Sequence, residues 1–253
     1  MAAIREAGYD GVQFHISPKP QELEEALKQG LGVCAAARVN VPEDAVRVAQ
    51  EAHLMGLECL TLHVGWGLED DDNAVRLIEA VLNASAKHSV PMYVETHRAT
   101  LFQDMWRAVG FHRRFPALEF NGDFSHWYTG QEMVYGGFET KFEFIKPMLE
   151  CVRFMHGRIG NPGSIQVDLG SGDSAEHPYI DHFKTLWTHV FTRYLKAETV
   201  KQEFFTFTPE LLAPDIYYAR TFQGKEESDR WQQSLLLRTI AQQCFAEAAK
   251  STK

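Results

Sequence analysis

Cysteine is scarce in this sequence, and no two cysteines stand close enough in the chain to suggest a metal knuckle or a redox pair. Four occur among 253 residues, with no Cys-x-x-Cys motif, and they are Cys34, Cys59, Cys151 and Cys244. Three of them lie in or beside apolar runs, where a reduced thiol packs as a small hydrophobic side chain. The pattern therefore favours reduced core cysteines over disulfides or a cysteine-bound zinc ion.

Long apolar runs and a secretion signal are also missing. No stretch of about 18 apolar residues occurs, so we expect no membrane span and no membrane partner. The opening residues, MAAIREAGYDG, lack the apolar region of a secretory signal. We therefore predict a cytoplasmic protein.

The sequence has no excess of positive charge. Lysine and arginine number 25 against 34 aspartates and glutamates, which gives a formal net charge of −9. A protein that binds the phosphate backbone of nucleic acid needs a basic face, so this balance argues against nucleic acid as a partner. A local basic pocket around one substrate phosphate remains compatible with it.

Segments with helical periodicity alternate with short apolar runs typical of strands, which favours a parallel α/β fold. No linker or change of composition divides the chain, so we predict a single domain over residues 1–253. The predicted strands are Tyr9–Ile16, Leu31–Arg38, Cys59–His63, Met92–Glu95, Leu118–Asp123, Val152–His156 and Phe204–Glu210. The predicted helices are Met1–Ala7, Pro20–Gln29, Pro42–Met55, Asp71–Lys87, Leu101–Phe111, Phe138–Cys151, Tyr179–Lys196 and Ser228–Lys250.

This alternation, in a chain of about the usual length, predicts a (β/α) TIM-type barrel. Such a barrel brings the carboxyl ends of its strands to one rim, where active sites are built. Seven strands are visible rather than eight, and the chain opens inside what resembles the first helix, so the first strand is missing from the pattern. Either the start is truncated or mis-assigned, or the gap between the two strand edges is closed another way.

Four of the predicted strands end on, or just before, a residue that can bind a metal ion. These residues are Glu95, Asp123, His156 and Glu210. Carboxylates with one imidazole form a hard-to-borderline ligand set, which suits Mn²⁺, Mg²⁺, Co²⁺ or Zn²⁺. A lone carboxylate at a strand end is more often a satisfied polar residue or a helix cap, but the four together favour one divalent metal ion.

The chain resembles the xylose-isomerase-like barrel superfamily, which includes sugar isomerases, sugar epimerases and zinc-dependent apurinic endonucleases. The resemblance runs from Ala2 to about Ala248 and is most specific in the sequences VETHR, DFSHW, MHGRIG and TPE. Their combination is more similar to a branch described only as sugar phosphate isomerase/epimerase-like. The family barrel has eight strands, one more than the pattern here.

The resemblance implies roles for the four candidate ligands. The equivalents of Glu95, Asp123, His156 and Glu210 hold one divalent ion in the superfamily. In its epimerase and ketose-isomerase branches the equivalents of Glu95 and Glu210 also move a proton through a metal-stabilised enediolate. We therefore predict that these two glutamates are catalytic.

Further residues near these strand ends are candidates for substrate binding. His126 could hydrogen-bond a substrate oxygen or support a metal ligand, with equal weight. Arg158 opens the long loop 157–177 and suits bidentate contact with a carboxylate or phosphate. Gln166 lies in the same loop, His97 follows Glu95, and a strand-end histidine such as His63 is more often structural.

The leading hypothesis is a metal-dependent isomerase or epimerase that acts on a small sugar, keto-sugar or sugar acid. A lyase or dehydratase acting on a polyol-derived ketone would begin with the same proton abstraction. A barrel that binds a metabolite without turnover is the non-enzymatic alternative. An apurinic endonuclease is disfavoured, because it uses three zinc ions and a larger ligand set. The resemblance also makes a homo-oligomer possible.

Overall fold

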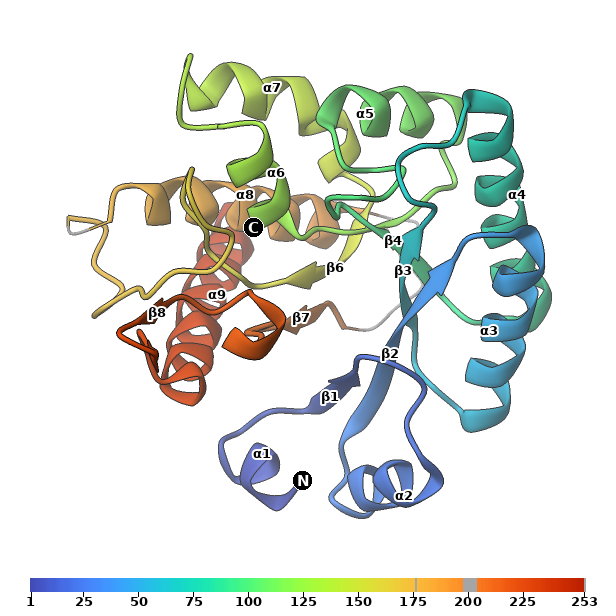
Figure 1. Ribbon diagram of the computed structural model, residues 1–253, viewed down its shortest axis with the longest axis horizontal. Coiled ribbons are helices and arrows are strands. Elements are labelled where there is room, and N and C mark those ends of the chain that lie inside the picture. The colour runs from blue at the N-terminus through green and yellow to red at the C-terminus, as the bar shows by residue number, and fades with distance from the viewer. Residues whose placement is uncertain (176, 198–203, 253) are drawn as a thin grey trace. The chain divides into compact units, whose positions relative to one another are not determined.

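The computed structural model describes residues 1–175, 177–197 and 204–252 (Figure 1). These residues form two compact units. Unit 1 comprises Met1–Gln103 and Gly110–Asn121, and unit 2 comprises Asp104–Val109 and the described residues of Gly122–Lys253. The single-domain prediction stays a prediction.

Unit 1 is built on parallel strands that are hydrogen-bonded in the order in which they occur in the chain. The strands are β1 (Gly11–Phe14), β2 (Gly32–Val39), β3 (Leu60–Val64), β4 (Met92–Glu95) and β5 (Phe120–Asn121). The helices are α1 (Ala2–Glu6), α2 (Pro20–Lys28), α3 (Pro42–Met55) and α4 (Asp71–His88), and α5 (Met105–Arg114) contributes residues to both units. Helices α3 and α4 pack side by side (Figure 1).

Unit 2 contains a parallel pair of strands, a short antiparallel hairpin and the remaining helices. The parallel strands are β6 (Val152–His156) and β7 (Thr206–Thr208), and the hairpin pairs β8 (Thr221–Phe222) with β9 (Lys225–Glu226). The helices are α6 (Phe124–Gly130), α7 (Phe138–Leu149), α8 (Tyr179–Lys196), the short 3₁₀ helix η1 (Pro214–Ile216) and α9 (Arg230–Ser251). Helix α8 packs against α9 (Figure 1).

The described residues contain seven parallel strands, five in unit 1 and two in unit 2, with helices between successive strands. This confirms the predicted strand number and the predicted fold class. Helix α8 has the predicted bounds, and α3 begins at Pro42 and ends before Gly56 as predicted. Gly56 adopts φ 67°, a left-handed conformation that lets glycine end a helix without strain.

Strands β4 and β6 are buried along their whole length. Apolar runs of this kind are typical of parallel strands that are covered on both faces. Each run nevertheless ends on a buried polar residue, Glu95 in β4 and His156 in β6. Burying such groups is costly unless other groups compensate them, so these two positions call for a local explanation.

Several local predictions were wrong. The segment after the predicted strand Leu118–Asp123 is the helix α6 rather than a loop, and α5 begins at Met105 instead of Leu101. Helix α4 is capped by Asp70, whose Oδ1 accepts a hydrogen bond of 2.8 Å from the backbone N–H of Asn73. The hairpin of β8 and β9 was not predicted.

The structure also bears on the residues that the sequence contains sparingly. None of the four cysteines forms a disulfide, and three of them are buried, as predicted for reduced core cysteines. In the part of the chain that the structure describes, no helix has both the length and the apolar composition needed to span a bilayer.

Candidate metal centre

Three side chains with ligand atoms meet in unit 2. Asp123 is the N-cap of α6, His156 is the last residue of β6, and Glu210 lies two residues beyond β7. His156 Nδ1 lies 3.8 Å from Asp123 Oδ2 and 3.6 Å from Glu210 Oε2. Because β6 and β7 are parallel neighbours, their carboxyl ends lie at the same edge, which brings His156 and Glu210 together.

Local structure fixes two of these positions. The carboxylate of Asp123 accepts hydrogen bonds from the backbone N–H of Ser125, at 3.1 Å, and from the Ser125 hydroxyl. Capping α6 thus orients the carboxylate. After His156 the chain passes close to a ring, because a Cβ on Gly157 would lie 1.9 Å from Cζ of Phe207. Only glycine fits at that position.

Arg158 lies fully buried among these groups. Its guanidinium forms ion pairs with Asp123 Oδ2 and with Glu210 Oε2, the latter at 3.0 Å. It also donates to Ser125 Oγ at 3.1 Å and contacts His126 Nε2 at 3.0 Å. The structure therefore places Arg158 against two candidate ligands, in addition to any contact with substrate.

The contact between Arg158 and His126 fixes where the histidine proton resides. A guanidinium has five N–H donors and no acceptor, so His126 Nε2 must be the acceptor. A neutral His126 then carries its proton on Nδ1. The distance of 3.5 Å between His126 Nε2 and Asp123 Oδ2 is consequently not that of an ion pair with a charged imidazolium.

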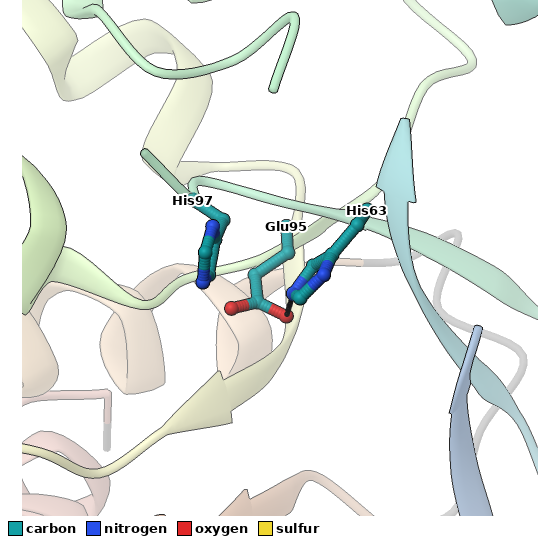
Figure 2. Close-up of side chains that lie close together, drawn as sticks. All are labelled: His63, Glu95 and His97. Atoms are coloured by element: carbon teal, nitrogen blue, oxygen red, sulfur yellow. Dashed lines mark ion pairs between the residues drawn. The ribbon is translucent and has the colours of Figure 1, made fainter. Parts of the chain in front are cut away.

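A second group of ligand atoms lies in unit 1 (Figure 2). Glu95 is the last residue of β4, His97 follows two residues later, and His63 belongs to β3. His63 Nε2 lies 3.2 Å from Glu95 Oε2, and the centroids of the two imidazole rings are 4.1 Å apart. Glu95 is only 1% exposed. The parallel pairing of β3 with β4 positions all three side chains at one edge.

Arg38, which no pattern in the sequence indicated, completes this group from β2. Its Nη1 donates to the carbonyl oxygen of Gly65 at 2.9 Å, and its Nη2 lies 3.3 Å from His63 Nδ1. The guanidinium carbon also lies 3.9 Å from the centre of the Trp66 ring, a cation–π arrangement. Because Arg38 and His63 are partners in the register of β2 and β3, the contact follows from strand pairing.

Charge and loop structure support the position of Arg38. Burial lowers the pKa of Arg38 below its usual value, and the negative charges of Glu95 and Glu69 offset only part of this shift. Glu69 also orders the loop after β3, since its carboxylate accepts hydrogen bonds of 2.8 and 2.9 Å from the backbone N–H groups of Trp66 and Gly67. That loop supplies both the carbonyl oxygen and the ring that Arg38 contacts.

Comparison of the sequence with models of known families gives no match, and comparison with curated proteins gives none either. Solved structures do match. A xylose isomerase-like TIM barrel protein from Mycobacterium smegmatis in complex with magnesium matches with a TM-score of 0.59 and 12% identity, over 99% of this chain and 87% of that chain. The chain has the fold of the xylose-isomerase-like TIM barrels.

Two further solved structures are similar to this chain. Endonuclease IV from Thermus thermophilus matches with a TM-score of 0.52 and 17% identity, over 96% of this chain and 93% of that chain. The probable 3-DHS dehydratase AsbF from Bacillus anthracis matches with a TM-score of 0.44 and 14% identity. Here the match covers 60% of this chain and 64% of that one, which is less than two thirds of its length.

On this fold, the trio of unit 2 (Asp123, His156 and Glu210) fits a divalent cation. The ligand atoms of Asp123, His156 and Glu210 all lie within 4.8 Å of one another, as donors around one ion at about 2.0–2.2 Å would. Two carboxylates facing the single positive charge of Arg158 leave one negative charge for a cation to neutralise. The donor set also has the oxygen and imidazole character that such ions prefer.

The other predicted substrate-binding residues lie in different surroundings. Gln166 donates to the carbonyl oxygen of Leu212 at 3.0 Å and accepts from its N–H at 2.9 Å, so its amide joins the long loop to the segment after Glu210. His97 belongs to the group of unit 1.

Proposed function

We propose that this protein is a divalent-metal-dependent isomerase or epimerase of a small sugar, keto-sugar or sugar acid. The observation that carries the proposal is the convergence of Asp123, His156 and Glu210 in a buried part of unit 2, on a xylose-isomerase-like fold. Glu95 belongs to unit 1, and its place as the fourth ligand and second acid/base is part of the proposal. A structure similar in fold contains magnesium, which supports a hard divalent ion here.

A divalent ion bound to a substrate carbonyl and an adjacent hydroxyl would stabilise the negative charge left when a C–H proton departs. The side chains do the rest. Glu210 is 14% exposed, so its carboxylate can both face an ion and reach a substrate proton. One glutamate would take the proton from the carbon next to the carbonyl. Return of a proton to the neighbouring carbon gives an isomer, and return to the opposite face gives an epimer.

Arg158 would serve this reaction by holding two carboxylates in place. Its ion pairs with Asp123 and Glu210 fix the oxygens that face His156. A carboxylate oxygen has two lone pairs, so one oxygen can accept from Arg158 and still bind an ion. The positive charge of Arg158 also offsets part of the repulsion between the two carboxylates.

Metal analysis tests the first part of the proposal. Protein purified without added metal or chelator should contain one divalent ion per chain, or take up one when Mn²⁺, Mg²⁺ or Zn²⁺ is offered. The variants Asp123→Asn and His156→Asn should lose it. Asp215→Asn, which removes an exposed carboxylate of η1, is the matched control and should retain it. Metal-free protein after all three additions would overturn the proposal.

Hydrogen exchange tests the chemistry across a range of candidate substrates. A panel of ketoses, aldoses and sugar acids is incubated in D₂O with the metal-loaded protein, and proton NMR follows deuterium entering the carbon next to the carbonyl. We expect exchange with at least one compound, abolished in Glu210→Gln and in Glu95→Gln. Exchange accompanied by loss of water would indicate a lyase or dehydratase instead, and binding without exchange a non-catalytic barrel. Cytoplasmic location and assembly into a homo-oligomer stay predictions.

A further inference from the structure

The chain segment that follows Glu210 returns to the charged groups of unit 2. We call this segment, residues 211–229, the strap; it contains η1 and the hairpin of β8 and β9. Two hydrogen bonds fix its start, because the side-chain amide of Gln166 donates to the carbonyl oxygen of Leu212 at 3.0 Å and accepts from its N–H at 2.9 Å. Its last residue, Asp229, caps α9 by accepting from two backbone N–H groups. Contacts within unit 2 therefore hold the strap at both ends.

Ion pairs hold the hairpin of the strap. Arg220 Nη2 lies 3.1 Å from Glu227 Oε1, and the N–H of Glu227 donates to the carbonyl oxygen of Arg220 at 3.0 Å. Arg230, the first residue of α9, has its Nε 2.7 Å from Glu226 Oε1. Surface ion pairs of this kind add little stability, but the second one links the hairpin to α9.

Between its fixed ends the strap turns sharply at Tyr217. This residue has φ 65° and ψ 23°, the left-handed region that residues other than glycine seldom adopt. It is 92% exposed, so packing of its own ring gains little from the turn. Strained conformations of this kind cluster at binding sites, where the surrounding structure maintains them. The residue that follows the turn, Tyr218, is the one that reaches the charged groups.

Tyr218 lies over the guanidinium of Arg158. The centre of its ring is 5.1 Å from Arg158 Cζ, within the range of a cation–π contact. The same guanidinium forms ion pairs with Asp123 and Glu210, so the ring and both carboxylates contact one group. Tyr218 is half-buried whereas Arg158 is fully buried, so the ring forms part of the boundary between solvent and these charges.

Glu210 is the member of the trio that a small molecule can reach. Its side chain is 14% exposed, whereas Asp123 and His156 are buried. A substrate that reaches Glu210 therefore arrives beside Arg158 and beside the ring that lies over it. A tyrosine ring is rigid and amphipathic, with an apolar face for C–H groups and a hydroxyl for polar ones, which suits contact with a sugar.

We propose that Tyr218 contacts the substrate and limits its length. The inference rests on the proposed function, in which Glu210 moves a proton at the carbon next to the carbonyl. With that carbon at Glu210, the ring over Arg158 bounds the space left for the rest of the sugar chain. Because the strap is held at both ends, the ring keeps its place, and short sugars are favoured over long ones.

A series of unphosphorylated ketoses of increasing chain length, from dihydroxyacetone to sedoheptulose, tests this role in the deuterium-exchange assay. We expect the rate of the parent protein to fall along the series. Tyr218→Ala should raise the rate with the longest ketose relative to the shortest by about 10-fold or more, the discrimination that the wall of a pocket can give. Tyr218→Leu should do so to a smaller extent, and Tyr218→Phe, which keeps the ring, should preserve the length profile of the parent.

The ratio of rates is informative because a variant that is merely destabilised slows the exchange of all compounds alike. Tyr217→Ala is the matched control, since it removes an exposed ring from the adjacent position of the strap, and it should keep the length profile. A flat profile in the parent, or an unchanged ratio in both Tyr218→Ala and Tyr218→Leu, would overturn the inference. An equal change in Tyr217→Ala would also overturn it, because the conformation of the strap and not the ring would then set the length.

Binding without turnover separates this inference from the proposed function. Saturation-transfer difference NMR measures binding of the same ketoses to the metal-loaded protein. If no ketose exchanges, but short ones bind better and Tyr218→Ala removes that preference, the proposed function fails and the inference stands. Exchange without a preference for length would sink the inference and leave the proposed function intact. If no ketose binds or exchanges, both are wrong.

Discussion

At the scale of single residues, the most consequential side chain is Arg158. It is fully buried and faces the carboxylates of Asp123 and Glu210, which lie in unit 2 with His156. A buried arginine between two acids compensates charges that would otherwise repel each other. The same carboxylates are the ones expected to bind an ion, so Arg158 and a cation act on the same oxygens.

Replacing Arg158 by methionine should therefore destabilise the protein by about 3–5 kcal/mol, the usual cost of breaking a buried ion pair. Urea denaturation measures the loss. Added Mn²⁺ should restore part of it, because a cation that binds only the folded state stabilises that state. Arg220→Met, which removes an ion pair with Glu227 at the surface, is the control and should cost at most about 1 kcal/mol. Equal losses in the two variants would contradict this account.

Tyr128 gives a pH-dependent prediction. Burial raises its pKa to about 12, and its hydroxyl contacts His182 Nδ1 at 2.8 Å. In the unfolded chain a tyrosine titrates near pH 10, so above that pH the unfolded state binds fewer protons than the folded one. Stability should therefore be complete below about pH 10 and fall as the pH rises toward about 12. Tyr128→Phe should remove this part of the alkaline loss, as urea midpoints from pH 8 to 11.5 would show.

At the scale of elements, the contact of β6 with β7 determines which residue can follow His156. A Cβ on Gly157 would overlap the ring of Phe207 at 1.9 Å. We expect Gly157→Ala to destabilise the protein by about 1–3 kcal/mol, the typical cost of overpacking. The double variant Gly157→Ala/Phe207→Leu should recover part of the loss in urea denaturation. An additive loss in the double variant would show that the ring is not the obstacle.

The N-terminus of helix α4 offers a simpler test of how much a capping residue stabilises a helix. Asp70 caps it through the N–H of Asn73 at 2.8 Å. Asp70→Ala should cost about 0.5–2 kcal/mol, the range for loss of a side-chain cap. Asp72→Ala removes a charge from the same first turn without removing the cap, and should cost less. A thermal or urea unfolding series compares the two variants directly.

The elements that the sequence predicted well are those with a clear periodicity or a clear stop signal. Helix α3 lies between Pro42 and Gly56, and α8 has its apolar stripe along one face. Helix α6 was missed because most of its residues are buried, including Ser125 and His126, so it has no polar face to reveal a helical period. Its first turn is nevertheless capped by Asp123, which was predicted as a metal ligand and not as a helix cap.

The candidate site likewise contains residues that the sequence could predict and contacts that it could not. The ends of β4 and β6 could be predicted, because a polar residue closing an apolar run is visible in the sequence. The position of Arg38 beside His63 could not, since it depends on the register between β2 and β3 rather than on any local pattern. Nor could the sequence show that Arg158 turns back onto the carboxylates. Both contacts join residues from different elements, and a local sequence pattern does not show which elements lie next to each other.

At the scale of the whole molecule, the fold is compatible with more than one chemistry, and charge helps to choose between them. The likeness to endonuclease IV, at 17% identity, is a likeness of fold. A protein that binds DNA releases counterions from the phosphates and needs clustered positive charge to do so. This chain has a formal net charge of −9.

We therefore expect no binding of a fluorescent duplex with an abasic site in anisotropy titrations at 150 mM salt, and no cleavage with zinc added. Weak binding that appears only at low salt would agree with a sequence-independent attraction. Tight binding at 150 mM salt, lost in Asp123→Asn and His156→Asn, would instead assign the trio of unit 2 to DNA chemistry and exclude a sugar as its main substrate.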